Sequence, residues 1–188
     1  MDVVEEAIIY ATQKHCGQVR KMSNIPYILH PLEVANIIAT ITTDKDVIAA
    51  GILHDTIEDC NADPREIREK FGIRVSALVQ SETEDKISNK PAAETWMERK
   101  KDSLLFLSHT KDIGVKTLWL ADKLSNLRSF YREFEKHGNA IWNALHQKDP
   151  KMQCWYYETI AKYTKELSET NAYKEFIFLI NKLFHEEE

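Results

Sequence analysis

The stretch that decides the fold is VIAAGILHDTIEDC, residues 47–60, where an apolar run leads directly into a cluster of ionisable side chains. The apolar residues repeat at helical spacing, which predicts a buried helix capped by Asp44 and running through about Asp59. Four ionisable residues lie at its end: His54, Asp55, Glu58 and Asp59. Because carboxylates at a helix C-terminus meet the negative end of the helix dipole and repel one another, a positive charge is expected there.

A bound divalent cation would supply that charge, since imidazole nitrogen and carboxylate oxygen are both metal ligands. The alternative is that this helix end reaches solvent, with Glu58 and Asp59 hydrated and His54 packed at the rim. For an isolated His-Asp pair that alternative is favoured. Two residues elsewhere in the chain favour the metal instead, His30 and Asp122.

His30 precedes Pro31 at the start of a predicted helix, from which its imidazole can point inward. Asp122 lies in LWLADKLSNLRSF, residues 118–130, which is apolar nearly all round, so an unpaired carboxylate there would be costly. Salt bridges from Asp122 to Lys123 or Arg128 do not match the favourable i, i+4 spacing. Asp122 is therefore expected to have a tertiary partner.

The rest of the chain predicts an all-α fold. Apolar residues recur at i, i+3 and i+4, the 188 residues include five glycines and five prolines, and no convincing alternating run predicts a strand. The length favours one domain over residues 1–188, with a motif-bearing core at about 11–130 and C-terminal packing helices at about 140–185. Helices are predicted at about 3–15, from 30, 44–59, 63–71, 73–82, 94–108, 115–135, 140–147, 151–167 and 172–184, with a loop at 85–93.

Composition and net charge disfavour several classes of function. There are 25 basic and 30 acidic residues, a formal net charge of −5, which disfavours general binding to nucleic acid or to an anionic membrane. No run approaches the length of a transmembrane helix, and the acidic first residues are unlike a secretory signal, so we expect a soluble cytoplasmic protein. Three cysteines without CxxC spacing favour neither a disulfide framework nor a zinc knuckle.

Six motifs in order then point to a family. They are HCGQVRK (15–21), PYILHPLEVA (26–35), LHDTIEDC (53–60), FGIRVSALV (71–79), ETEDK (82–86) and LADKLSNLRS (120–129). In order and approximate spacing the chain resembles the HD-domain hydrolases of the alarmone guanosine tetraphosphate. It looks like a small stand-alone alarmone hydrolase, similar to the hydrolase half of the bifunctional synthetase/hydrolases, over about residues 11–128.

The resemblance implies a set of roles for residues of this chain. One Mn²⁺ per chain would be held by His30, His54, Asp55 and Asp122, and Glu58 and Asp59 would position and deprotonate the attacking water. Contacts with a small-molecule nucleotide would come from Arg20 and Lys21 near the base and phosphates, Asn126 near the ribose and Ser129 near the base. Lys123 or Arg128 would add to the cationic cluster that the negative net charge requires. The implied reaction is removal of pyrophosphate from the ribose 3′ position of guanosine 3′,5′-bis(diphosphate), which leaves GDP.

Three alternatives stay open at this stage. A two-iron oxidase would need extra histidines between Asp55 and Asp122, where the sequence has His109 alone. Another 3′-phosphorylated nucleotide, such as NADPH, would use the same chemistry. A non-catalytic nucleotide-binding helical module is the third, although every expected metal and acid position is filled. The remaining histidines, His15, His137, His146 and His185, are expected in packing or surface roles, and the aromatic residues Trp142, Trp155, Tyr156 and Tyr157 in the core.

Overall fold

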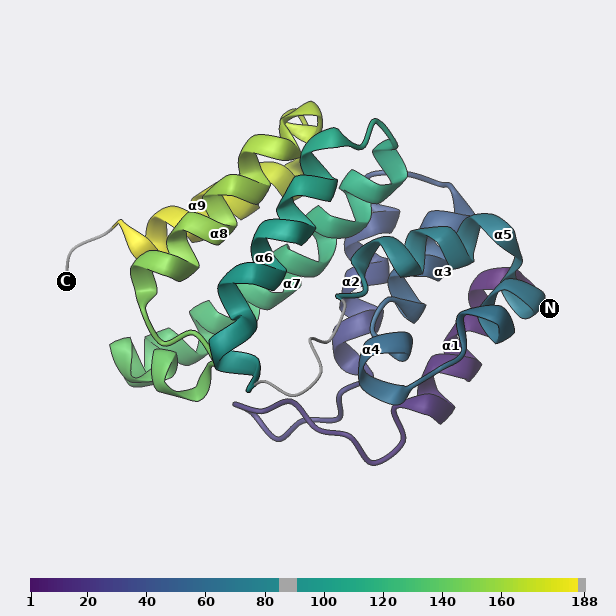
Figure 1. Cartoon of the computed structure of the whole chain (residues 1–188), viewed down its shortest axis with the longest axis horizontal. Helices are drawn as coiled ribbons and strands as arrows, with labels where there is room; N and C mark the ends of the chain where they lie inside the picture. Colours follow the sequence, from purple (N-terminus) through teal and green to yellow (C-terminus); the bar gives the residue numbers. More distant parts are fainter. Residues whose placement is uncertain (85–90, 186–188) are drawn as a thin grey trace.

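The computed structural model describes residues 1–84 and 91–185, and its regular secondary structure is helical (Figure 1). The helices are α1 (Val3–Lys14), α2 (Leu29–Ala39), α3 (Lys45–Leu53), α4 (Thr56–Cys60), α5 (Pro64–Glu82), α6 (Ala92–His109), α7 (Ile113–His137), α8 (Pro150–Tyr163) and α9 (Asn171–Phe184), with short 3₁₀ helices η1 (Gly138–Ala144) and η2 (Lys165–Leu167). The predicted all-α fold is confirmed. Most of the loop predicted at 85–93 lies outside the described residues, and α6 begins at its end.

Helices α2, α3 and α7 pack against one another and carry the residues on which the functional prediction depends. Helix α3 approaches α2 closely at Gly51, where an added Cβ atom would overlap the side chain of Ile38. The long helix α7 then passes from this group to α8 and α9, which pack on its other side (Figure 1). Buried apolar side chains fill the space on both sides of α7, among them Leu118, Leu120, Leu124 and Leu127.

The helix predicted through Asp59 is in fact broken, which corrects the sequence-based prediction. Helix α3 ends at Leu53 and α4 begins at Thr56, with Asp55 between them at φ −89° and ψ −4°. Side chains take two of the carbonyls at this break: the Thr56 hydroxyl donates to Leu53 O at 2.6 Å and His54 Nδ1 lies 2.8 Å from Gly51 O. Periodicity alone does not reveal such local competition for backbone acceptors.

Other helix boundaries were predicted with mixed success. Gly72 interrupts α5 with φ 92° and ψ 170°, as its predicted position outside a short helix requires. The helix predicted at 140–147 is instead the 3₁₀ helix η1. The helix predicted to reach residue 167 ends at Tyr163, and the chain turns into η2.

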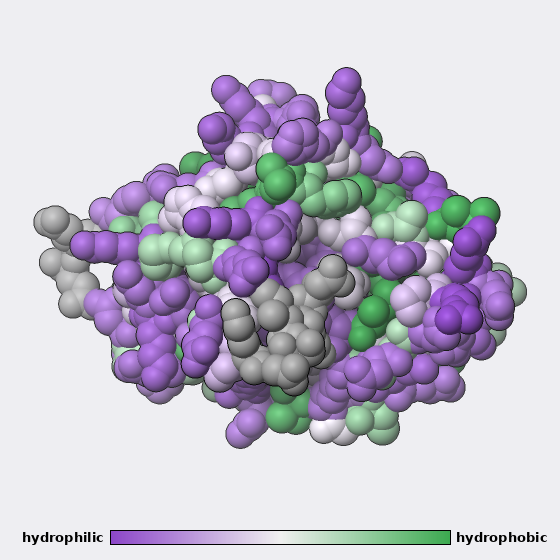
Figure 2. Space-filling model, in the orientation of Figure 1, coloured by the Kyte–Doolittle hydropathy of each residue, from purple (hydrophilic) through white to green (hydrophobic). Residues whose placement is uncertain are grey.

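Hydrophilic side chains cover most of the face shown in Figure 2, and the apolar residues on it form small separate groups. Among the described residues, no helix combines the length and the hydrophobicity needed to cross a bilayer.

Candidate metal centre

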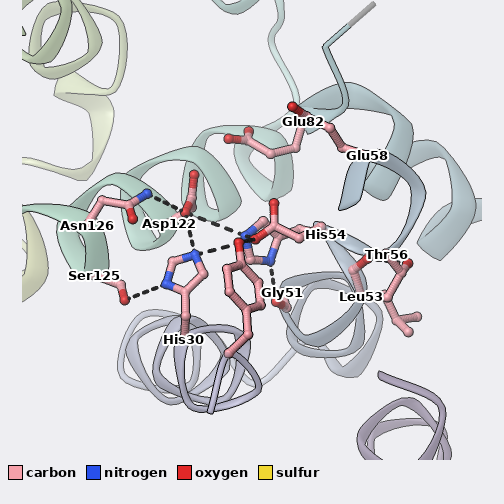
Figure 3. A network of polar contacts seen from close by, with 12 residues as sticks. His30, Gly51, Leu53, His54, Thr56, Glu58, Glu82, Asp122, Ser125 and Asn126 are labelled. Carbon is pink, nitrogen blue, oxygen red and sulfur yellow. Dashed lines mark hydrogen bonds and ion pairs between the residues drawn. The ribbon is translucent and has the colours of Figure 1, made fainter. Parts of the chain in front are cut away.

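Four side chains from separate parts of the sequence meet between α2, α3 and α7 (Figure 3). His30 lies in the first turn of α2, His54 follows α3, Asp55 lies at the break and Asp122 is in the middle of α7. Asp122 Oδ1 is 3.0 Å from His30 Nε2 and 3.5 Å from His54 Nε2. Asp55 Oδ2 is 3.5 Å and 2.9 Å from the same two nitrogens. All four predicted ligands are therefore brought together.

Hydrogen bonds fix the tautomer of His30. Its Nδ1 is 2.9 Å from the Ser125 hydroxyl, which donates its own hydrogen to Glu33 Oε2 at 2.7 Å. Since the hydroxyl has one hydrogen, it can only accept from the imidazole, so Nδ1 carries the proton. The neutral ring consequently presents the lone pair of Nε2 to Asp55 and Asp122. A carboxylate, a hydroxyl and an imidazole in series are a common support for a metal-binding histidine.

His54 is fixed in the same way by the backbone. Its Nδ1 faces the Gly51 carbonyl, which can only accept, so Nδ1 is a donor and Nε2 carries the lone pair when the ring is neutral. Nε2 is buried and makes no hydrogen bond, although Asp55 Oδ2 lies 2.9 Å away. With both rings neutral, two imidazole lone pairs face two carboxylates at short range, an arrangement that is repulsive unless a metal cation or a proton lies between them. The residues present therefore fit a divalent metal.

The pKa directions agree with this need for positive charge. Burial lowers the pKa of His54, but the carboxylates of Asp55 and Asp122 outweigh burial and hold it well above its usual value. For His30, burial dominates and the pKa is lowered. Burial acts to raise the pKa of Asp122, yet the Lys123 ammonium and the two histidines hold it well below its usual range. Burial likewise acts to raise the pKa of Asp55, but His54 and His30 lower it, so both carboxylates are ionised at neutral pH and able to bind a cation.

Asp122 forms an ion pair with Lys123, which its sequence spacing did not predict. Lys123 forms ion pairs with Asp122 Oδ2 and, at 2.6 Å, with Glu82 Oε1. The i, i+1 pair forms because both carboxylates are buried and the lysine bends over Trp119 to reach them. Burial raises the pKa of Glu82 to about 8, with Lys123 opposing that effect, and Glu82 Oε2 has no hydrogen-bond partner. Lys123 therefore holds one oxygen of Asp122 while the other faces the histidines.

Two further contacts extend from the four side chains. Asn126 Nδ2 donates to Asp122 Oδ1 at 2.9 Å, and Asn126 Oδ1 accepts from Arg20 Nη2 at 2.9 Å. The Tyr27 hydroxyl donates to Asp55 Oδ2 at 2.7 Å. The sequence did not predict the supporting role of Tyr27, although Tyr27 lies in the motif PYILHPLEVA, three residues before His30.

The loop that carries Arg20 is held against this centre by His15. The His15 ring stacks on Tyr27 with centroids 4.9 Å apart, and its Nδ1 lies 2.8 Å from Gln18 Oε1. The imidazole is buried, so the expected packing role is confirmed. Arg20 also lies over the Tyr27 ring, with its guanidinium carbon 5.6 Å from the ring centroid.

A cavity of about 580 Å³ opens above the metal centre. All the other predicted site residues line it: Arg20, Lys21, Glu58, Asp59, Lys123, Asn126 and Ser129. Burial raises the pKa of Glu58, and the nearby Glu84, Asp55 and Asp59 carboxylates add to the effect. A carboxylate with a raised pKa beside a metal centre is suited to accept a proton from water.

Several other residues that line the cavity were not predicted as site residues. Arg99 and Lys100 of α6 both pair with Glu84 there. Tyr156 and Tyr157 are buried as expected, but both also line the cavity, and Lys100 lies over the Tyr156 ring at 4.8 Å. His146 reaches the cavity from beyond η1, and its Nε2 lies 3.4 Å from Lys21 Nζ.

Two residues considered from the sequence lie elsewhere. Arg128 is not part of the cavity lining and instead pairs with Glu175 at 2.6 Å and Glu33 at 3.2 Å, so it does not join the cationic cluster. His109 is exposed at the end of α6, where Nδ1 lies 2.8 Å from Leu105 O. The described residues therefore do not bring His109 to the metal centre, which favours the single-metal interpretation.

The fold and this centre define an all-helical protein with a His/Asp divalent-metal site. A family model described as HD domain matches residues 7–150, and the chain belongs to the HD-domain family. HD domains bind divalent metals.

Among curated proteins, the chain is 38% identical over 133 residues to a GTP pyrophosphokinase of Myxococcus xanthus, which covers 69% of this chain and 17% of that relative. It is also 38% identical over 136 residues to a putative chloroplastic GTP diphosphokinase of Arabidopsis thaliana, covering 69% of this chain and 15% of the relative. The chain thus matches less than a fifth of the length of these relatives.

Two solved structures share the fold. One is the crystal structure of lmo0812 from Listeria monocytogenes EGD-e, with a TM-score of 0.73, 29% identity, and coverage of 84% of this chain and 99% of that one. The other is a metazoan ortholog of SpoT that is described as hydrolysing ppGpp, with a TM-score of 0.74, 23% identity, and coverage of 97% and 95%.

Proposed function

We propose that this protein hydrolyses guanosine 3′,5′-bis(diphosphate), releasing pyrophosphate from the ribose 3′ position and leaving GDP. The observation that carries the proposal is the pair of imidazole lone pairs facing Asp55 and Asp122 on the floor of the cavity. The names of the curated relatives point to guanosine nucleotides and diphosphate transfer, and a protein of the same fold is described as a ppGpp hydrolase.

The proposed ligands are His30, His54, Asp55 and Asp122, and the proposed metal is Mn²⁺. Nitrogen and oxygen donors without sulfur suit manganese. When bound, such an ion supplies a nucleophile at neutral pH and relieves negative charge around phosphorus. Lys123 stabilises this site because it holds Asp122 Oδ2 and leaves Oδ1 directed at the histidines.

Glu58 and Asp59 are the proposed proton acceptors. Helix α4 places them one turn beyond the break, at the cavity wall. At the metal centre, the ligand atoms that lie within 4.8 Å of one another belong to His30, His54 and Asp122, and Asp55 joins them through its contacts with the two imidazoles. Burial and the neighbouring carboxylates raise the pKa of Glu58, which makes it a stronger base than an ordinary glutamate. The role of these two residues is to orient the attacking water and take its proton.

The proposed nucleotide site is the part of the cavity lined by the basic and polar side chains of Arg20, Lys21, Asn126 and Ser129. Arg20 and Lys21 reach the cavity from one side and Asn126 and Ser129 from α7. The Arg20 guanidinium, already stacked near Tyr27, is suited to pairing with phosphate and to stacking on a purine. Because Asn126 bonds to both Arg20 and Asp122, a ribose bound near Asn126 would lie beside the metal centre.

The test is to incubate the purified protein with the alarmone and Mn²⁺, with Mg²⁺ and chelator samples in parallel, and to measure pyrophosphate and GDP. Both products should form in equal amounts and should disappear with the chelator. NADPH and other 3′-phosphorylated nucleotides are tested in the same way. Absence of pyrophosphate from metal-loaded protein would refute the substrate assignment. Faster turnover of another nucleotide would favour that substrate, and binding without turnover would favour a nucleotide-binding module.

A further inference from the structure

A second cluster of metal-ligating side chains lies where α8 meets the end of α9. Cys154 and Glu158 are one turn apart on α8, and His185 caps α9, which packs against α8. His185 Nε2 lies 2.9 Å from Glu158 Oε1 and 3.7 Å from Cys154 Sγ. One ligand atom from each of the three residues lies within 4.8 Å of the other two.

We propose that Cys154, Glu158 and His185 form a zinc site separate from the hydrolase centre. With zinc bonds of about 2.0–2.3 Å, the ligand atoms of a tetrahedral site lie about 3.3–3.8 Å apart. The two separations from His185 Nε2, 2.9 Å to Glu158 Oε1 and 3.7 Å to Cys154 Sγ, are close to that spacing, and the third lies within 4.8 Å. Without a metal the Glu158 carboxylate interacts with both the His185 imidazole and the Cys154 thiol, and a metal ion would replace the shared protons and engage all three side chains.

The backbone holds these three groups in place. Residues at i and i+4 share one face of a helix, which aligns Cys154 with Glu158. The His185 amide donates to Asn181 O at 3.0 Å and so continues the hydrogen bonding of α9. Two packed helices therefore determine the site, and binding is expected to join the end of α9 to α8.

The chemistry of the donors distinguishes the two sites. The hydrolase centre offers nitrogen and oxygen, but the second cluster adds sulfur, and thiolate selects zinc over manganese. Burial and the neighbouring Glu158 raise the pKa of the Cys154 thiol to about 11, so zinc binding must displace its proton to solvent. Mn²⁺, a harder ion, does not compete well for such a ligand set.

Three protein ligands leave one coordination position of a tetrahedral ion open. A cavity of about 550 Å³ lies beside the cluster, and Lys151 and Asn139 contribute to its lining. Water or a small anion fits the fourth position, and the Lys151 ammonium favours the anion.

Cobalt(II) provides the direct test, because thiolate bound to it gives a sulfur-to-metal charge-transfer band that nitrogen and oxygen ligands do not give. The full chain is titrated with Co²⁺ as wild type, Cys154→Ser and Cys16→Ser. The band should appear in the wild type and in Cys16→Ser, an exposed cysteine outside the cluster, and be absent from Cys154→Ser. His185→Gln should weaken binding at least tenfold.

Thermal unfolding with Zn²⁺ gives an independent readout. At a zinc concentration about a hundredfold above the dissociation constant, the increase in Tm should be about 5–10 °C greater for the wild type than for Cys154→Ser. No band in the wild type, a band that persists in Cys154→Ser, or equal Tm shifts in the two proteins would each overturn the proposal. None of these measurements depends on hydrolase activity.

Discussion

Replacing Ser125 with alanine tests whether the support of His30 decides metal binding. The substitution removes the hydroxyl that accepts from His30 Nδ1 at 2.9 Å and donates to Glu33 at 2.7 Å. Since Ser125 is 1% exposed and His30 is 4% exposed, water cannot easily replace it. A buried donor without an acceptor costs about 1–3 kcal/mol.

The free-energy cost of leaving His30 Nδ1 without an acceptor is expected to lower the affinity of the site for its metal. If the whole cost of about 1–3 kcal/mol destabilises the metal-bound state and not the metal-free state, the dissociation constant for the metal rises about 5- to 150-fold, because each 1.4 kcal/mol is a factor of ten. Partners of metal-binding histidines in other proteins are worth about 10- to 100-fold. The expected result for Ser125→Ala is therefore a loss of about 10- to 100-fold in Mn²⁺ affinity.

Calorimetric titration of the metal-free protein with Mn²⁺ measures this loss. Ser76→Ala is the matched control, since Ser76 is equally buried but its hydroxyl donates to Pro64 O at the start of α5. The control should lose some thermal stability and keep its metal affinity. Wild-type affinity in Ser125→Ala would show that the hydroxyl does not fix the imidazole, and an equal loss in both variants would assign the effect to general destabilisation.

Three further predictions concern the same centre. Asp122→Ala should abolish metal retention and turnover together, measured by elemental analysis and pyrophosphate release; normal activity would refute the proposed ligands. Glu58→Gln should lower kcat about 10²- to 10⁴-fold with metal content unchanged. Because Glu58 must be ionised to act as a base and its pKa is raised, the wild-type rate should fall with decreasing pH at a value above the usual carboxylate range, and Glu58→Gln should lose that dependence. Tyr27→Phe removes the 2.7 Å hydrogen bond to Asp55 and should weaken Mn²⁺ binding about tenfold, whereas Tyr173→Phe, whose hydroxyl bonds to Ala161 O, should not.

Much of the fold follows from local patterns in the sequence. Helical periodicity located the helices, and the glycine at position 72 located the kink in α5. Capping residues were also informative: the side chains of Asp44 and Asp63 accept from backbone amides at the starts of α3 and α5. The prediction of one continuous helix failed at the break between α3 and α4, where the side chains of His54 and Thr56 bond to backbone carbonyls, because such bonds depend on rotamers that periodicity does not describe.

For the candidate site, too, the sequence predicted some features and the tertiary structure decided others. The sequence by itself placed an imidazole and carboxylates at the end of a buried helix, and it showed that a carboxylate at position 122 needed a tertiary partner. Only the tertiary structure decided that Ser125 and Glu33 orient His30, that Lys123 holds Asp122, and that Cys154 faces His185. The physical reason is the sequence separation over which each interaction acts. Helix spacing and capping act within about one turn, whereas these contacts join distant segments that are brought together by the packing of whole helices.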